Sequence, residues 1–382
     1  MRILVFNGYY FPSKNYGGPQ TSIQNLIEAC GDLHDFFVVC KNHDYNSRRS
    51  FDAPVRQVVK VGKANVIYIE DGDLDYSLDS MTSFLKAYKP NIIWFSGVLV
   101  PAQKMVGCMA ARKLHIPVLF SPRGELNEDH VRIKAWKKKP MLWLLRHSGL
   151  FKDAFFHATG SDEYNGVVNY LRPRTDHVFN VPNVALTKQP ICCDHVKKEG
   201  YLRCFFLSRI HPVKNISYAI DVLSQCKTHI VYDIYGPIED DHYWTYCLNK
   251  LSKIGPNVHV EYKGFLAHEN MESTIQTYDC LFFMSENENY SHTIAETLAN
   301  SRPVVIGKHA TPWDDIDGKA GFVVPLDNPQ VAASKLDYLA MMEDDSYKKL
   351  ISSVNNYYLT APLITSAVSG HLRMFESIFN SV

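Results

Sequence analysis

Two glutamates lie on either side of a short polar segment in the second half of the chain. The segment follows the apolar run Cys280–Phe283, which predicts a buried strand, and it leads into a helical pattern. Glu288 lies in the loop and Glu296 about one turn into the helix, so the carboxylates can contact opposite ends of one elongated ligand. Amides from Ser291 to Thr293 would meet a negative group between them, and ligand hydroxyls would donate to the carboxylates. The alternative is two solvated glutamates around an ordinary helix start.

A second loop carries two positive side chains. Arg209 and Lys214 are five residues apart, between a strand predicted at Arg203–Leu207 and a helix predicted at Asn215–Gln225. Arginine offers a planar fork to phosphate oxygens and lysine a compact charge, so the pair can bind phosphate beside a helix N-terminus. The alternative is two solvated charges, but the position directly after a strand favours phosphate binding.

A third loop, rich in glycine, follows the first predicted strand, Arg2–Phe6. It ends in Tyr16-Gly17-Gly18-Pro19, where a helix begins. Adjacent glycines let the backbone approach a ligand closely, and the amides of the helix start favour an anion. An ordinary turn is the alternative, so this motif is weak by itself.

The elements that must position these loops alternate along the chain. Short runs that are apolar on both faces are separated by helical patterns, which is typical of a parallel sheet covered on both sides. Further strands are expected at Phe36–Cys40, Ile92–Phe95, Val118–Ser121, Ala154–Ala158, His177–Val181, Ile230–Tyr235, Val258–Glu261 and Pro303–Ile306. Helices are expected at Gln20–Cys30, Asp79–Tyr88, Ala102–Leu114, Asp162–Leu171, Trp244–Lys253, Glu269–Thr277 and Thr293–Asn300. The pattern restarts near Arg203, so the fold class is α/β with two Rossmann-like, doubly wound domains that would trap a ligand at the carboxyl ends of their strands.

The domain boundary is expected in the segment Pro182–Gly200. It contains two prolines and the adjacent pair Cys192 and Cys193, and it has no clear period. We therefore place an N-terminal domain at residues 1–185 and a C-terminal domain at residues 186–364. The last segment, Thr365–Phe379, has a helical pattern.

Composition narrows the classes of function. The chain has 40 basic and 40 acidic residues in 382, so no overall charge favours nucleic acid, and no nucleic-acid partner is expected. Nine cysteines without metal-ligand spacing predict reduced thiols, and the N-terminus does not have the pattern of a signal peptide. We therefore expect a cytoplasmic protein. Asp240-Asp241 and Asp314-Asp315 lie in polar loops, and neither an essential metal nor a cofactor is expected.

Residues 131–146 combine a basic cluster with tryptophan and leucine. The segment includes Lys137, Lys138 and Lys139 between Trp136 and Trp143. Such a mixture can lie at an anionic membrane surface, which would make the protein peripheral at the inner face of the membrane. The alternative is an ordinary packed helix with one solvated end.

These motifs resemble those of the retaining glycosyltransferases of family four, which have the GT-B fold. Glu288 and Glu296 fit the family's signature of a glutamate, seven residues and a second glutamate. Residues 208–214 resemble its Arg/Lys diphosphate loop, and residues 16–19 its N-terminal glycine loop. Two further segments resemble members that assemble polysaccharides, Ser121-Pro122-Arg123-Gly124 and Thr311-Pro312-Trp313. The five motifs stand in the family's order along the chain.

The resemblance implies a substrate and roles. Two domains would face a central cleft that binds a nucleotide-diphosphate sugar, with UDP- and GDP-sugars as the expected donors. Arg209 and Lys214 would neutralise the diphosphate, Glu288 would contact the transferred sugar, and Glu296 would accept hydrogen bonds from the ribose. The acceptor would be a glycan or lipid-linked glycan in cell-surface polysaccharide assembly. Residues 365–382 would pack back on the first domain.

Other donor-binding residues follow from the same resemblance. Gly17 and Gly18 would let the first domain close on the diphosphate, and the amides of Ser291, His292 and Thr293 would hold phosphates or sugar hydroxyls.

The chain also departs from the family's pattern. Ser291 and Ser301 stand where glycine is usual, and a side chain at Ser291 would narrow the sugar pocket. The acceptor-side loop has Arg123 and Glu125 in place of a His-Asp or His-Glu pair, so these two are candidates for acceptor or sugar contacts.

Other functions remain open at this point. A GT-B nucleotide-sugar epimerase or hydrolase would share the donor site, and a non-catalytic nucleotide-sugar binding protein would share the fold. A nicotinamide-dependent dehydrogenase fits the α/β alternation, but the loop after the first strand lacks the GxGxxG pattern.

Overall fold

The computed structural model describes residues 1–13, 17–45, 47–72, 77–99, 101–132, 135–185, 189–191 and 195–381. Contacts divide the chain into two compact units, Met1–Val184 with Thr365–Val382, and Ala185–Ile364. The boundary at Val184 falls inside the segment that the sequence suggests as a linker. Some residues of interest lie outside the described residues, namely Tyr16 of the glycine loop, Cys192 and Cys193, and Ile133 and Lys134 of the basic segment.

The first unit is built on an eight-stranded sheet in the order β3-β4-β2-β1-β5-β6-β7-β8. Its strands are β1 (Arg2–Phe6), β2 (Asp35–Lys41), β3 (Val58–Val61), β4 (Ala64–Ile69), β5 (Ile92–Ser96), β6 (Val118–Ser121), β7 (Phe155–Ala158) and β8 (Val178–Asn180). Neighbouring strands are parallel except β3 and β4, an antiparallel pair at the edge. The sequence prediction omitted this edge pair.

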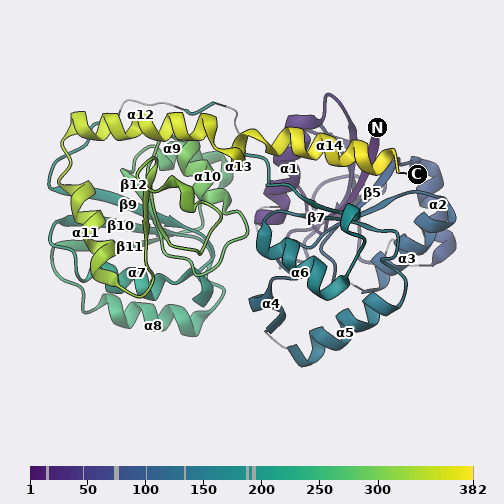
Figure 1. The fold of residues 1–382 in the computed structure, drawn as a ribbon, viewed down its shortest axis with the longest axis horizontal. Coiled ribbons are helices and arrows are strands. Elements are labelled where there is room, and N and C mark those ends of the chain that lie inside the picture. Colours follow the sequence, from purple (N-terminus) through teal and green to yellow (C-terminus); the bar gives the residue numbers. More distant parts are fainter. Residues whose placement is uncertain are drawn as a thin grey trace. The chain divides into compact units, whose positions relative to one another are not determined.

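Helices cover the first sheet on both faces, as its apolar strands require (Figure 1). They are α1 (Gly18–Cys30), α2 (Leu78–Tyr88), α3 (Pro101–Lys113), α4 (Glu128–Arg132), α5 (Ala135–His147), α6 (Ser161–Leu171) and α14 (Ala367–Phe379). α14 is the last helix of the chain, yet its Phe375 ring lies 6.1 Å from Phe36 and 5.9 Å from Trp94. The core of the first unit therefore includes residues from the C-terminus.

The second unit has a six-stranded sheet in the order β11-β10-β9-β12-β13-β14, and all its pairs are parallel. Its strands are β9 (Tyr201–Leu207), β10 (His229–Tyr235), β11 (Val258–Gly264), β12 (Cys280–Phe283), β13 (Val304–Gly307) and β14 (Gly321–Val324). Its helices are α7 (Ile216–Leu223), α8 (Asp241–Leu251), α9 (Met271–Ile275), α10 (His292–Ala299), α11 (Pro329–Ala340), α12 (Asp344–Thr360) and α13 (Pro362–Thr365), which ends at the unit boundary. The predicted fold class, two doubly wound parallel-sheet units, is confirmed.

Each sheet reverses its strand order at one point. In the first unit the reversal lies between β1 and β5, and in the second between β9 and β12. Open α/β sheets bind ligands beside the carboxyl ends of the strands at such a point. The strand order thus singles out the glycine loop after β1, the basic loop after β9 and the glutamate loop after β12.

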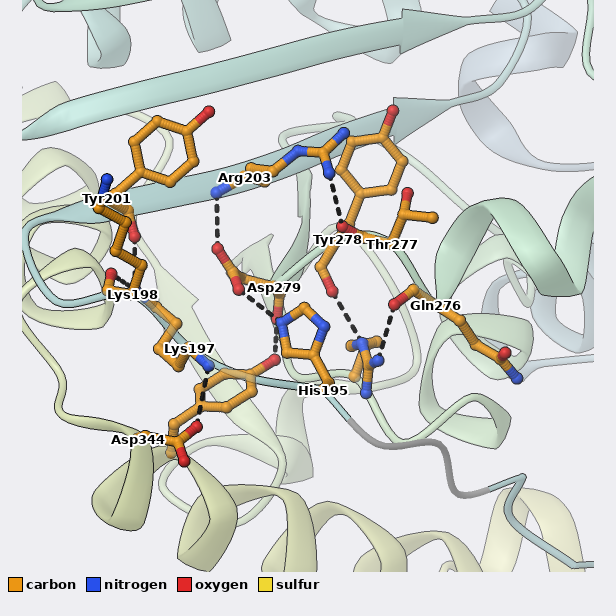
Figure 2. Close-up of polar contacts among 12 residues, drawn as sticks. His195, Lys197, Lys198, Tyr201, Arg203, Gln276, Thr277, Tyr278, Asp279 and Asp344 are labelled. Carbon is orange, nitrogen blue, oxygen red and sulfur yellow. Dashed lines mark hydrogen bonds and ion pairs between the residues drawn. The ribbon is translucent and has the colours of Figure 1, made fainter.

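A buried polar network lies at the amino ends of β9 and β12 in the second sheet (Figure 2). Asp279 accepts a hydrogen bond from the backbone amide of Arg203 at 2.7 Å, and its other carboxylate oxygen lies 2.7 Å from Nε2 of His195. Lys197 is also buried, and its ammonium donates to the carbonyl of Ala340 at 3.1 Å. These contacts fasten the chain from His195 onward to the second unit, at the edge away from the candidate loops.

Candidate functional site

The glutamate loop after β12 holds a buried ion pair. The ammonium of Lys214 is bonded to the carboxylate of Glu288, and the two side chains are only 9% and 12% exposed. The backbone amide of Glu288 donates to the carbonyl of Ala310 at 2.7 Å, which fixes the loop from its other side. The structure thus brings together one of the two predicted cations and one of the two predicted carboxylates.

Backbone and hydroxyl contacts tie the basic loop to the glutamate loop. The amide of Glu286 and the hydroxyl of Ser285 both donate to the carbonyl of Val213, at 2.9 and 3.1 Å. Thr293, in the first turn of α10, donates from its hydroxyl to the carbonyl of Leu207 at 2.8 Å. Since Leu207 ends β9, the N-terminus of α10 is held directly beside the end of that strand.

Arg209 has a different partner from Lys214. Its Nη1 donates to both carboxylate oxygens of Glu239, at 2.8 and 2.7 Å, and the Arg209 side chain is about half exposed. The loops after β9 and β10 are joined by two backbone bonds, from Ile210 to Pro237 at 2.8 Å and from Glu239 to Ile210 at 3.1 Å. Glu239 is therefore held in place beside the guanidinium, while the other guanidinium nitrogens still have donors to offer.

Glu296 is buried in α10 with 8% of its surface exposed. Among the described residues its carboxylate has no hydrogen-bond partner, and burial raises its pKa to about 8. A buried carboxyl group without a partner is costly. A ligand hydroxyl that reached this group would remove part of that cost.

The N-terminus of α10 has an unusual backbone. Ser291 is its N-cap residue and has a φ of 62°, a left-handed conformation that glycine adopts more easily. The preceding carbonyl, of Tyr290, accepts a hydrogen bond from the indole of the buried Trp313. The ring of His292 lies 5.1 Å from that of Tyr290. Trp313 thus anchors the backbone directly before the amides of Ser291 to Thr293.

The glycine loop opens α1 in the first unit. Gly17 is the N-cap with a φ of 74°, and α1 begins at Gly18. A Cβ atom added to either glycine would have no described atom within 4 Å. The described atoms therefore leave space beside both glycines.

Arg123 and Glu125 are both engaged inside the first unit. Arg123 has a φ of 55° and donates to the side chain of Asn183 at 3.0 Å. Glu125 accepts hydrogen bonds from the amides of Val98 and Leu99 at 2.5 and 2.9 Å. Glu125 thus orders the loop after β5.

The sequence prediction missed Glu239 and the anchoring role of Trp313. Glu239 could have been found because it lies three residues after Gly236, which follows β10, and β10 and β9 are neighbours with a common carboxyl edge. Within the described residues no group of three or more His, Cys, Asp or Glu side chains could hold a metal ion. None of the described helices has the length and apolarity that a membrane crossing requires.

Two family models match the chain. The model of the glycosyl transferases group 1 matches residues 192–356, and that of the glycosyl transferase 4-like domain matches residues 17–183. Together they cover most of both units, including all the loops described above except the part of the glycine loop before Gly17. No curated protein matches the chain.

Solved structures share the fold at low sequence identity. HepE of Anabaena, in complex with UDP and glucose, is 16% identical with full coverage of both chains and a TM-score of 0.73. The sucrose-phosphate synthase of Thermosynechococcus elongatus is 12% identical, again with full coverage, at a TM-score of 0.72. WaaG, a glycosyltransferase involved in lipopolysaccharide biosynthesis, is 12% identical over 98% of this chain and 99% of its own, at a TM-score of 0.66.

Proposed function

The chain belongs to the family-four type of glycosyltransferases with the GT-B fold, and from this premise we propose that it transfers a sugar with retention of configuration and without an essential metal. The donor is a nucleotide-diphosphate sugar, and the acceptor is a glycan or lipid-linked glycan. The observation that supports this best is the buried Lys214–Glu288 pair at the β9–β12 reversal, followed along α10 by Glu296, whose carboxylate has no hydrogen-bond partner in the part of the chain that the structure describes.

The positive groups account for the chemistry. Transfer breaks the bond between the anomeric carbon and a phosphate oxygen, so negative charge grows on the leaving diphosphate. Lys214 and the free nitrogens of the Arg209 guanidinium would stabilise that charge in the place of a metal ion. When the diphosphate takes over Lys214, the carboxylate of Glu288 is released to accept hydrogen bonds from hydroxyls of the transferred sugar. Front-face attack assisted by the diphosphate then gives retention without a covalent intermediate.

The donor and acceptor classes rest on likeness. HepE binds UDP and UDP-glucose, which supports a UDP-sugar donor here, with GDP-sugars as the second choice. WaaG acts in lipopolysaccharide biosynthesis, which supports a role in cell-surface polysaccharide assembly. Thermal shifts with UDP, GDP and ADP would identify the base.

A membrane-facing role is supported by α5. Trp136, Trp143 and Leu144 are 74%, 61% and 62% exposed. Trp136, Pro140, Trp143 and His147 recur at helical spacing on one outward stripe, with Lys137 and Lys139 beside it, whereas Leu142 and Leu145 are buried on the opposite face. An exposed aromatic stripe with basic flanks fits an anionic membrane surface, so we place the enzyme at the inner face of the membrane, in the cytoplasm.

Transfer of a radiolabelled sugar from its nucleotide to an acceptor tests the proposed reaction. Lys214→Ala should lower turnover by about 100-fold or more, because a fixed donor to the leaving group is lost. Lys250→Ala is the matched control, since Lys250 forms an ion pair with Asp221 in the same unit. Free sugar or an epimer as the only product would favour a hydrolase or epimerase, and donor binding without any product would favour a binding protein.

The mechanistic details need separate measurements. Proton NMR of the initial product gives its anomeric configuration, and inversion would contradict the retaining mechanism. A glycosyl ester on Glu288 trapped in the parent chain would contradict front-face attack, and retaining transfer that persists in Glu288→Gln would support it. Loss of activity in EDTA, restored by a divalent cation, would contradict metal independence.

A further inference from the structure

The first unit has a polar cavity of about 260 Å³ that none of the residues discussed so far lines. It lies at the carboxyl ends of β2 and β4, on the β1 side of the sheet's reversal point. Its lining residues are all polar or charged: Asn42, His43, Arg48, Ser50, Glu70 and Asp71. These side chains can exchange hydrogen bonds with a polar ligand.

One lining side chain is buried without a partner. Asn42 is 3% exposed, and its carboxamide oxygen has no hydrogen bond within the described residues. Nε2 of His43 is also buried, and at 3.6 Å it is too far from the carboxylate of Asp71 for a hydrogen bond. An unsatisfied buried polar atom is costly, so a hydroxyl donor placed beside Asn42 would bind favourably.

The charges in the cavity are mixed. Arg48 and His43 face the same space as Glu70 and Asp71. Lys41 lies 2.9 Å from Asp71, and their hydrogen bond lowers the pKa of that carboxyl group, so Asp71 is ionised at neutral pH. A simple anion would meet the carboxylates and a simple cation would meet Arg48. A neutral ligand with several hydroxyls can instead donate to the carboxylates and accept from Arg48 and Ser50.

Aromatic rings lie beside the cavity. The ring of Tyr9 is 5.7 Å from that of His43 and 5.5 Å from that of Tyr45, in edge-to-face geometry. The hydroxyl of Ser13 donates to Asp44 at 2.6 Å, which ties the loop after β1 to the loop after β2. Because the loop after β1 also ends in Gly17 and Gly18, the cavity and the glycine loop belong to one connected edge of the first sheet.

We propose that this cavity binds one sugar ring of the acceptor. Its volume is below the roughly 300–1,000 Å³ of sites for drug-sized ligands, which fits a single ring better than an oligosaccharide. Asn42 and Ser50 contact hydroxyls, and the carboxylates of Glu70 and Asp71 accept from others. The proposal rests on the proposed transferase function, because only that function supplies a sugar acceptor.

Saturation-transfer NMR on the full chain tests this site. The probes are the methyl α- and β-glycosides of glucose, galactose, mannose and N-acetylglucosamine. Two variants address the cavity: Asn42→Leu is nearly isosteric and removes the hydrogen bonds, and Ser50→Trp fills the exposed rim. Ser334→Trp, at an exposed serine in α11 of the second unit, is the matched control. Thermal unfolding and UDP binding show whether each variant is folded.

We expect at least one glycoside to bind the parent chain. Its affinity should fall about tenfold or more in Asn42→Leu and be lost in Ser50→Trp, with Ser334→Trp and UDP binding unchanged. No binding by any probe, or equal binding in both cavity variants and the parent, would overturn the proposal. Glycoside binding that the variants abolish, in a chain that neither binds UDP nor hydrolyses any sugar nucleotide, would support the sugar site and contradict the transferase function.

Discussion

At the scale of single residues, the two predicted cations differ in how firmly they are held. The Arg209–Glu239 pair is half exposed, and such pairs contribute only about 0–1 kcal/mol, so a diphosphate can displace Glu239 at little cost. The Lys214–Glu288 pair is mostly buried, and removing one partner of a buried pair costs about 3–5 kcal/mol. Substitutions at Arg209 should therefore change donor binding and turnover with little effect on stability, whereas those at Lys214 need a parallel measurement of stability.

Glu296 should lower the stability of the folded chain while it contributes to donor binding. Its pKa is about 8 in the folded chain and 4.5 in the reference state, so the native state binds more protons between these values and stability falls as pH rises through this range. Glu296→Gln removes that penalty. We expect its gain in unfolding free energy over the parent to grow from about pH 5 to pH 8, by roughly 1.4 kcal/mol per pH unit at most, while UDP affinity falls. Urea unfolding at both pH values checks this; a gain that is independent of pH would contradict it.

The two serines at usual glycine positions should respond differently to glycine. Ser291 and Ser301 have φ values of 62° and 58°, where an L side chain costs about 1–2 kcal/mol. Ser291 makes no capping hydrogen bond with its side chain, so Ser291→Gly should raise the free energy of unfolding by about 1 kcal/mol. The hydroxyl of Ser301 donates to the carbonyl of Ile191 at 3.0 Å. Ser301→Gly therefore loses this hydrogen bond while it relieves the left-handed conformation, and its free energy of unfolding should change little. Denaturant midpoints of both variants test the contrast, and equal effects would refute it.

At the scale of elements, the sequence predicts the central strands well because they are buried on both faces. Val118–Ser121 and Cys280–Phe283 have the bounds that the apolar runs indicate. The sequence prediction does not include β3, β4 or β14. Of these strands, β3 is half exposed, and β14 is short and partly exposed.

The candidate site was predictable in part, for a related reason. Glu288 and Lys214 lie in loops that directly follow neighbouring strands, so their meeting follows from strand order. The pairing of Arg209 with Glu239 depends on contacts between the loops after β9 and β10, which no local pattern encodes. The hydrogen bonds from the amides of Val98 and Leu99 to the carboxylate of Glu125 also depend on contacts between loops, which the local sequence does not predict.

The helix α14 should make the first unit sensitive to acid. His371 is buried on α14, 4.8 Å from the ring of His157, and burial lowers its pKa from 6.5 to about 4. The unfolded chain therefore binds a proton that the native state does not, so stability is lost as pH falls from about 6.5 to 4, by about 3 kcal/mol for this group. His371→Gln, which keeps a donor for the carbonyl of Ala367, should reduce this loss. Unfolding midpoints from about pH 7 to 4.5 measure it; an unchanged pH profile in the variant would contradict this role.

At the scale of the whole molecule, both units use one plan. In each, the first strand of the sheet lies at the reversal of strand order, and the loop after it carries a predicted phosphate-binding motif, Gly17-Gly18 in one and Arg209 with Lys214 in the other. The chain has no net charge to attract an anionic substrate or surface, so both must be recognised by local groups. Two local groups of residues are candidates for this recognition: the loops at the reversals of strand order, and the outward stripe of α5.

The stripe on α5 should bind anionic lipid through two separable contributions. Trp136 and Trp143 would bury apolar surface in the interface, and each lysine near an anionic surface contributes about 1 kcal/mol. In flotation assays the parent chain should bind vesicles containing phosphatidylglycerol and fail to bind neutral vesicles. The double change Trp136→Ser with Trp143→Ser should weaken binding at every salt concentration, whereas Lys137→Gln with Lys139→Gln should weaken it mainly at low salt, because salt screens charge and not apolar burial. Tyr338→Ser is the control, since Tyr338 is an equally exposed aromatic residue on α11 of the second unit. Flotation that is unchanged in both double variants would exclude α5 as the membrane contact.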